Sequence, residues 1–132
     1  MYFNNNDIEE KIYKTKNSYY YKNKDGKIIS KLNYYDYNIP DFDWILVANL
    51  DTRKEYRRRG LATNLLNSLY KDIDKQGKGL YMAVSINNYN ALKLYKELGF
   101  KENKKYKSDG NEYIIMIKGN ADTNQFKNMN FS

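Results

Sequence analysis

Hydrophobic residues recur along the chain in patterns that predict a sheet and two helices. Long apolar, β-branched runs at 44–52 and 80–86 predict buried strands. Between these runs, leucines spaced three and four residues apart predict an amphipathic helix over 61–75. Because a helix separates the two strands, we expect them to be parallel and joined by a right-handed crossover. A second helix is predicted over 89–98, with Gly99 as its stop signal.

Turn residues predict two hairpins. The segments "SYYYK" and "KIISKLNYY" are rich in β-prone residues and are separated by a tight turn at 23–26. Strands near 101–106 and 112–118 meet in the same way at "SDGN". The predicted order is therefore strand, strand, strand, helix, strand, helix, strand, strand, which describes a mixed sheet with two helices packed on it.

The two ends of the chain carry weaker signals. The segment at 7–16 predicts a short helix, with Asp7 as its cap and Ile8 and Ile12 on one side. The segment from Gly119 onward is polar and aperiodic, which predicts a mobile tail at 119–132.

Composition predicts one domain and restricts its chemistry. With 132 residues, 41% of them hydrophobic, the whole chain 1–132 suits a single domain that needs no disulfide. The chain contains neither cysteine nor histidine, so catalysis must rest on Tyr, Asp, Glu, Lys, Ser or the backbone. No apolar run approaches the length of a membrane span, and the segment after Met1 lacks the pattern of a signal peptide. We therefore expect a cytoplasmic protein that does not enter membranes.

Positive charge gathers at the predicted start of the first helix. The net charge is +7, and residues 53–59 hold five basic side chains against Glu55. A helix start already carries partial positive charge, so this arrangement calls for an anion. Gly60 has no Cβ to keep a ligand away from the backbone, and we call residues 57–63 the phosphate loop. The alternative is a solvated basic loop before an ordinary amphipathic helix.

Two motifs resemble those of the GCN5-related N-acetyltransferases, or GNAT enzymes. The first is an Arg or Gln followed at fixed spacing by Gly and by Gly or Ala at a strand-to-helix junction, matched by Arg57, Gly60 and Ala62. The second lies in "NNYNALKLYKELGF" and is matched by Asn88, Ala91, Leu94, Tyr95, Gly99 and Phe100. The resemblance covers about 44–100, extends through the hairpins to about 18–118, and implies a GNAT-like α/β (α+β) fold with a mainly antiparallel sheet and a central parallel strand pair.

The resemblance implies acetyl-CoA as cosubstrate. Amides of the phosphate loop would hold the CoA pyrophosphate, and its arginines would face the 3′-phosphate. The edge of the strand at 44–52 would pair with the pantetheine arm and leave the acetyl carbonyl near a main-chain amide. The cosubstrate-binding residues so implied are Leu50, Asp51, Thr52, Arg57, Arg58, Arg59, Gly60, Leu61, Ala62, Thr63 and Asn88.

The resemblance also implies direct attack of an amine on acetyl-CoA in one ternary complex. Tyr95 matches the position of the family's general acid, although a tyrosine on an apolar helix face is otherwise a packing residue. Many members carry a catalytic Glu where this chain has Ala83, and Asp51 is the nearest carboxylate for the role of base. Asn88 would lie near the CoA arm, cap the second helix, or do both.

The acceptor is an amine of a small molecule or a peptide, and the sequence does not identify it. Asp41 and Asp43, with Tyr37, Phe42 and Trp44, could bind a cationic amine, or could form an ordinary acidic turn beside the core. Typical members begin with a strand and two helices that form one wall of the acceptor cleft, whereas only seventeen residues precede the first hairpin here. A wall shortened in this way would favour a homodimer.

Two other classes of function are open. A CoA-binding module without catalysis is suggested by Ala83 and the shortened front of the chain. The charge pattern disfavours nucleic-acid binding through the basic run and the tyrosines, since the arginines gather at one junction instead of lining a long surface.

Overall fold

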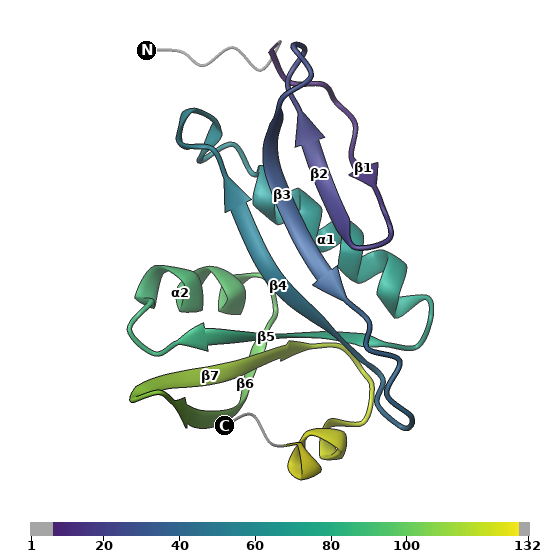
Figure 1. Cartoon of the computed structure of the whole chain (residues 1–132), viewed down its shortest axis with the longest axis vertical. Coiled ribbons are helices and arrows are strands. Elements are labelled where there is room, and N and C mark those ends of the chain that lie inside the picture. The colour runs from purple at the N-terminus through teal and green to yellow at the C-terminus, as the bar shows by residue number, and fades with distance from the viewer. Residues whose placement is uncertain (1–6, 130–132) are drawn as a thin grey trace. The chain divides into compact units, whose positions relative to one another are not determined.

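The structure, a computed structural model, describes residues 7–129 and divides the chain into two compact units (Figure 1). The first unit contains the chain up to Tyr35 together with Val47–Lys71, and the second contains Asp36–Leu46 and the chain from Asp72 onward. The single domain expected over the whole sequence stays a prediction.

The described residues form a mixed sheet and two α-helices, as predicted. The strand order is β1-β2-β3-β4-β5-β7-β6, in which only β4 and β5 form a recorded parallel pair. Within the described part of the chain, no helix is long and apolar enough to cross a bilayer. The elements are β1 (Tyr13–Lys14), β2 (Ser18–Lys22), β3 (Ile28–Tyr35), β4 (Trp44–Thr52), the 3-10 helix η2 (Lys54–Tyr56), α1 (Leu61–Asp74), β5 (Gly79–Ser85), α2 (Tyr89–Glu97), β6 (Lys101–Ser108), β7 (Asn111–Lys118) and the 3-10 helix η3 (Thr123–Asn128).

In the first unit, the predicted hairpin and the apolar stripe of α1 supply the core. Strands β2 and β3 pair antiparallel across the turn predicted at 23–26, and β1 pairs with β2. Side chains at spacings of three and four along α1 are buried, which is why this segment forms a helix that packs. The buried residues of the unit include Tyr19, Tyr21, Ile29, Leu32, Leu61, Leu65, Leu66 and Leu69.

The helix predicted over 7–16 is wrong. Ile8 instead forms a β-bridge with Asn23, and the Glu9 N–H donates to the Lys22 carbonyl at 3.0 Å. Farther along, β1 adds to the edge of β2, so backbone pairing with the hairpin takes the place of helical hydrogen bonds. The apolar spacing of this segment was too short a signal to outweigh a neighbouring strand edge.

In the second unit, β5 lies between the start of β4 and β7. Trp44–Leu46 pairs in parallel with Gly79–Tyr81, and β7 pairs antiparallel with both β5 and β6. The turn between β6 and β7 has positive φ at Asp109 (51°) and Gly110 (79°), which is the backbone expected of a two-residue hairpin turn. The parallel pair and the second hairpin are therefore confirmed.

The segment after Gly119, for which the sequence predicts no regular structure, forms η3. Phe126 within it is only 1% exposed, and its ring centroid lies 5.0 Å from that of Trp44 and 5.4 Å from that of Tyr81. One aromatic residue in a polar run thus anchors the segment to the core of the second unit. The last part of the predicted tail, 130–132, lies outside the described residues.

Candidate functional site

The phosphate loop connects η2 to α1, at the strand-to-helix junction where the sequence places it. Its backbone reverses direction through two residues with positive φ, Arg58 at 65° and Gly60 at 77°. A non-glycine residue in this region is uncommon and is often found where backbone amides are aimed at a ligand. Left-handed residues interspersed with extended or helical ones form concave amide surfaces that suit anions.

The start of α1 leaves backbone donors available beside this turn. The Asn64 N–H donates to the Gly60 carbonyl at 2.9 Å and is the first hydrogen bond of the helix ladder. The amides of the three residues before Asn64, at 61–63, therefore precede that ladder. The first turn of α1 contains no acidic residue, and a Cβ built on Gly60 would meet no atom within 4 Å. The open space at Gly60, the amides at 61–63 and the three arginines thus lie next to one another at the start of α1.

The three consecutive arginines have different surroundings. Arg57 Nε donates to the Thr52 carbonyl at 2.9 Å and ties the loop to the end of β4. Arg59 Nη2 donates to the Glu55 carbonyl at 2.9 Å, and its guanidinium carbon lies 5.0 Å from the centroid of the Tyr56 ring. The Arg58 side chain is exposed and has no hydrogen bond or ion pair to any residue in the described range 7–129. Arg58 is therefore the member of the run that is available to a phosphate.

The part of β4 next to the phosphate loop is tied to β3. Leu50, Asp51 and Thr52 form the last stretch of this strand. On the β3 side, Ser30 Oγ and Thr52 Oγ1 are 2.7 Å apart, and the Arg53 N–H donates to the Ile29 carbonyl at 2.8 Å. The end of the strand that leads into the phosphate loop is thus fixed to β3.

Asn88 and Tyr95 belong to the second unit and sit at opposite ends of α2. Asn88 Oδ1 accepts from the Ala91 N–H at 3.2 Å, which confirms the helix cap. At the other end, the Phe100 N–H donates to the Tyr95 carbonyl at 2.9 Å past Gly99, whose φ of 93° permits this reversal.

The Tyr95 side chain is half-buried, and its ring centroid lies 5.8 Å from that of Phe100. Burial raises the pKa of the Tyr95 hydroxyl above its usual value, because the charged phenolate would lose hydration. The hydroxyl is thus protonated at neutral pH, as a proton donor must be. Tyr95 belongs to the second unit, whereas the phosphate loop belongs to the first unit.

The carboxylate proposed as base has an ordinary environment. Asp51 is exposed on β4 and lines a hollow of about 340 Å³ together with Lys31 and Arg53. Ala83 is exposed on β5 and brings no acid to that strand position. The assignment of Asp51 as base stays a prediction.

The acidic turn at 41–43 is explained by packing. The Asp43 N–H donates to Gln125 Oε1 at 2.8 Å, and Gln125 Nε2 donates back to Asp43 Oδ2 at 2.9 Å. Trp44 is 2% exposed, and Phe42 packs against the same aromatic cluster. Of the two interpretations, the acidic turn beside the core is the one that these residues support, because a buried Trp44 cannot present its ring to a ligand.

Sequence reasoning missed Tyr56, which lies directly before the arginines. Its ring faces the Arg59 guanidinium, and its hydroxyl donates to Asp7 Oδ2. The available signal was an aromatic residue next to three cations, an arrangement that favours cation–π contact.

Comparison with known proteins agrees with these motifs. Residues 44–108 match the family described as FR47-like protein. An N-alpha-acetyltransferase of Saccharolobus solfataricus is 35% identical over 77 residues, which cover 54% of this chain and 46% of that protein. The chain thus spans about half the length of the curated relatives it matches.

Solved structures show the same fold. The ribosomal-protein-S18-alanine N-acetyltransferase of Escherichia coli aligns with a TM-score of 0.62 and 25% identity, over 84% of this chain and 70% of that one. Arabidopsis thaliana NAA60 in complex with acetyl-CoA aligns with a TM-score of 0.62 and 18% identity, over 77% of this chain and 75% of that one. The motifs, the strand order and these likenesses together support a member of the GCN5-related N-acetyltransferase family.

Proposed function

We propose that this protein is an N-acetyltransferase that transfers the acetyl group of acetyl-CoA to the α-amino group of a peptide or protein. The observation that carries the proposal is the phosphate loop, where a left-handed turn, the amides that precede the helix ladder and an exposed Arg58 adjoin one another. The choice of acceptor rests on the relatives, since the curated ones are named N-alpha-acetyltransferases and the bacterial structure is named for an alanine of a ribosomal protein.

The proposed binding mode uses three parts of the first unit. The amides at 61–63 take the pyrophosphate, for which a helix start is suited by its dipole and its unused N–H groups. Arg58 pairs with the 3′-phosphate, because a guanidinium can donate two parallel hydrogen bonds to phosphate oxygens. The backbone of β4 before Thr52 hydrogen-bonds the pantetheine amides.

The proposed reaction is a direct transfer. The neutral amine attacks the acetyl carbon, a C–N bond forms and the C–S bond breaks, and the amine proton is lost to a base. Tyr95 donates its hydroxyl proton to the leaving thiolate of CoA, and burial keeps this hydroxyl in the protonated form by raising its pKa. Asp51 is the proposed base, and a backbone amide of β4 is the proposed donor to the oxyanion.

Calorimetric titration with acetyl-CoA tests the binding step. Gly60→Asp introduces a carboxylate where a Cβ meets open space, so we expect folded protein that loses at least tenfold in affinity through repulsion of the phosphates. Gly60→Asn is the uncharged control for Gly60→Asp, because asparagine has a similar size and also tolerates the left-handed backbone. We expect it to lose much less affinity for acetyl-CoA. Gly77→Asp is a control for adding the same carboxylate away from the phosphate loop. Gly77 also has a positive φ, 75°, and a Cβ there would likewise meet open space after the end of α1.

The pattern across these variants decides the proposal. Tight binding by wild type and Gly77→Asp, with loss in Gly60→Asp, supports the phosphate loop. Equal affinities in all four proteins, or no binding by wild type, would contradict it.

A CoA-binding module without catalysis is the second candidate, favoured by the exposed Ala83 in place of an acid. Release of the CoA thiol that depends on an added peptide with a free N-terminus separates the two. Binding of acetyl-CoA without such release from any amine would establish the module and exclude the transferase.

A further inference from the structure

The Tyr56 hydroxyl joins three segments of the first unit. It donates to the carboxylate oxygen Oδ2 of Asp7, in the N-terminal segment, and accepts from Asn23 Nδ2, in the turn before β3, at 3.4 Å. The ring of the same residue lies under the Arg59 guanidinium at 5.0 Å. One side chain thus connects the phosphate loop to two segments far from it in sequence.

Both segments that hold this hydroxyl are themselves fixed. Asn23 is 7% exposed, and its Oδ1 accepts from the N–H groups of Asp25 at 3.1 Å and Lys27 at 2.9 Å. The Asp7 carbonyl accepts from the Lys24 N–H at 2.9 Å. Asn23 is therefore a buried part of the hairpin, and Asp7 is an exposed residue whose backbone is bonded to that hairpin.

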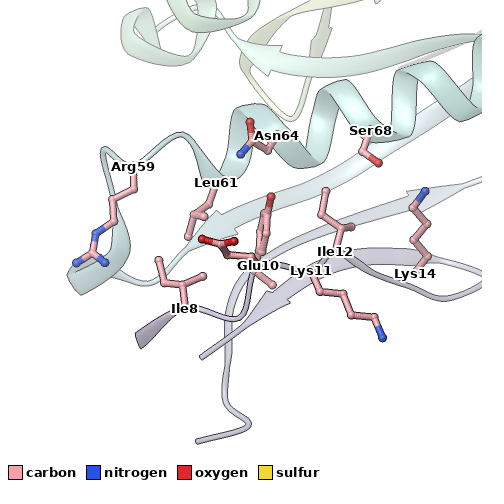
Figure 2. Close-up of a pocket in the computed structure, with 10 residues that line it drawn as sticks. Ile8, Glu10, Lys11, Ile12, Lys14, Arg59, Leu61, Asn64 and Ser68 are labelled. Atoms are coloured by element: carbon pink, nitrogen blue, oxygen red, sulfur yellow. The ribbon is translucent and has the colours of Figure 1, made fainter. Parts of the chain in front are cut away.

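A hollow lies between the phosphate loop and the N-terminal segment. Figure 2 shows Ile8, the neighbour of Asp7, facing Leu61 and Arg59 across a hollow of about 570 Å³ that these residues line. Because the hollow intervenes, the hydrogen bond from Tyr56 to Asp7 bridges the two segments directly. Tyr56 lies two residues before Arg58, whose backbone has a positive φ of 65°.

We propose that Asp7, Asn23 and Tyr56 form a brace that holds the phosphate loop in its binding conformation, so that they are positioning residues for acetyl-CoA. The inference rests on the proposed function. A loop that is ordered before the ligand arrives does not lose that conformational freedom on binding, and the affinity is higher for this reason. The brace touches no ligand atom and acts through Arg58, Arg59 and the loop amides.

The test is a double-mutant cycle on the affinity for acetyl-CoA. Tyr56→Phe removes the hydroxyl and keeps the ring under Arg59, whereas Asp7→Ala removes the acceptor. We expect each variant to bind about fivefold more weakly, and the double variant to be no weaker than the poorer single one, because both remove the same tie. Tyr13→Phe is the matched control, since Tyr13 donates to the Glu9 carboxylate in the same unit without touching the loop.

Each outcome has a distinct meaning. Equal weakening by Tyr13→Phe, or additive losses in the double variant, would overturn the brace while leaving cosubstrate binding intact. Unchanged affinity for acetyl-CoA in Tyr56→Phe and Asp7→Ala would also overturn the brace. Failure of the wild type itself to bind would instead overturn the proposed function, and the brace with it. Circular dichroism of each variant confirms folding, and Asp7→Asn, which keeps an acceptor oxygen, should restore part of the affinity.

Discussion

At the scale of single residues, the three consecutive arginines at 57–59 make different contacts although their side chains are identical. The Arg57 and Arg59 side chains donate to the backbone carbonyls of Thr52 and Glu55, just before the phosphate loop, whereas the Arg58 side chain is exposed to solvent. The planar guanidinium suits both tasks, because it can donate in several directions at fixed angles. Replacement by lysine would therefore affect the three positions differently, although the charge is kept.

Tyr95 gives the sharpest residue-scale prediction about chemistry. Tyr95→Phe should lower kcat about a hundredfold, since general acids typically contribute that much, and should leave the affinity for acetyl-CoA unchanged. Steady-state kinetics with a peptide acceptor, together with calorimetry, measure the two quantities. Tyr89→Phe, on the same helix but with the side chain 74% exposed, should retain full activity. Full activity of Tyr95→Phe would remove this residue from the mechanism.

At the scale of elements, the short helix η3 stabilises the second unit through one ring. Phe126→Ala should lower the free energy of unfolding by about 3–5 kcal/mol, because it leaves a cavity between Trp44, Tyr81 and Phe42. Lys127→Ala, exposed on the same helix, should change it by less than about 0.5 kcal/mol. Urea denaturation compares the two, and a similar small loss in both would show that η3 contributes little.

Elements marked by a periodic pattern or a turn signal could be predicted from the sequence, whereas β1 and η3 could not. β4 appears at the residues predicted, and α1 ends within one residue of its predicted end, since both have many apolar positions that must be buried together. The 7–16 segment and η3 depend on partners remote in sequence, Asn23 for one and Trp44 for the other. No local pattern carries such information.

The candidate site divides in the same way. The phosphate loop could be located from motif spacing, and the cap at Asn88 from its residue type. The separate tasks of the three arginines, and the part played by Tyr56, depend on which carbonyl or carboxylate each side chain reaches. The spacing of residues in the sequence does not show which acceptor each side chain hydrogen-bonds.

At the scale of the whole molecule, stability should decrease at alkaline pH. Burial, with a smaller effect of the nearby Tyr37, raises the pKa of Tyr81 to about 12, whereas an unfolded tyrosine ionises near pH 10. The folded state then holds more protons than the unfolded state between these values, so the stabilisation present below pH 10 is lost as pH rises through about 12.

The expected loss from this residue is about 1 kcal/mol between pH 9 and pH 11. Urea denaturation at the two pH values measures it, and Tyr81→Phe should show a shallower decrease than wild type. Parallel decreases in the two proteins would assign the effect to other groups.

The division of the chain into two units has a consequence for its evolution and engineering. The backbone passes from one unit to the other after residues 35, 46 and 71, so β4 and α1 each begin in one unit and end in the other. Neither unit is a continuous stretch, and no single cut releases one of them intact. Modules exchanged between genes are continuous segments with their own core. This protein can therefore gain additions at its ends or in its turns, whereas half of it cannot be replaced by recombination at one point.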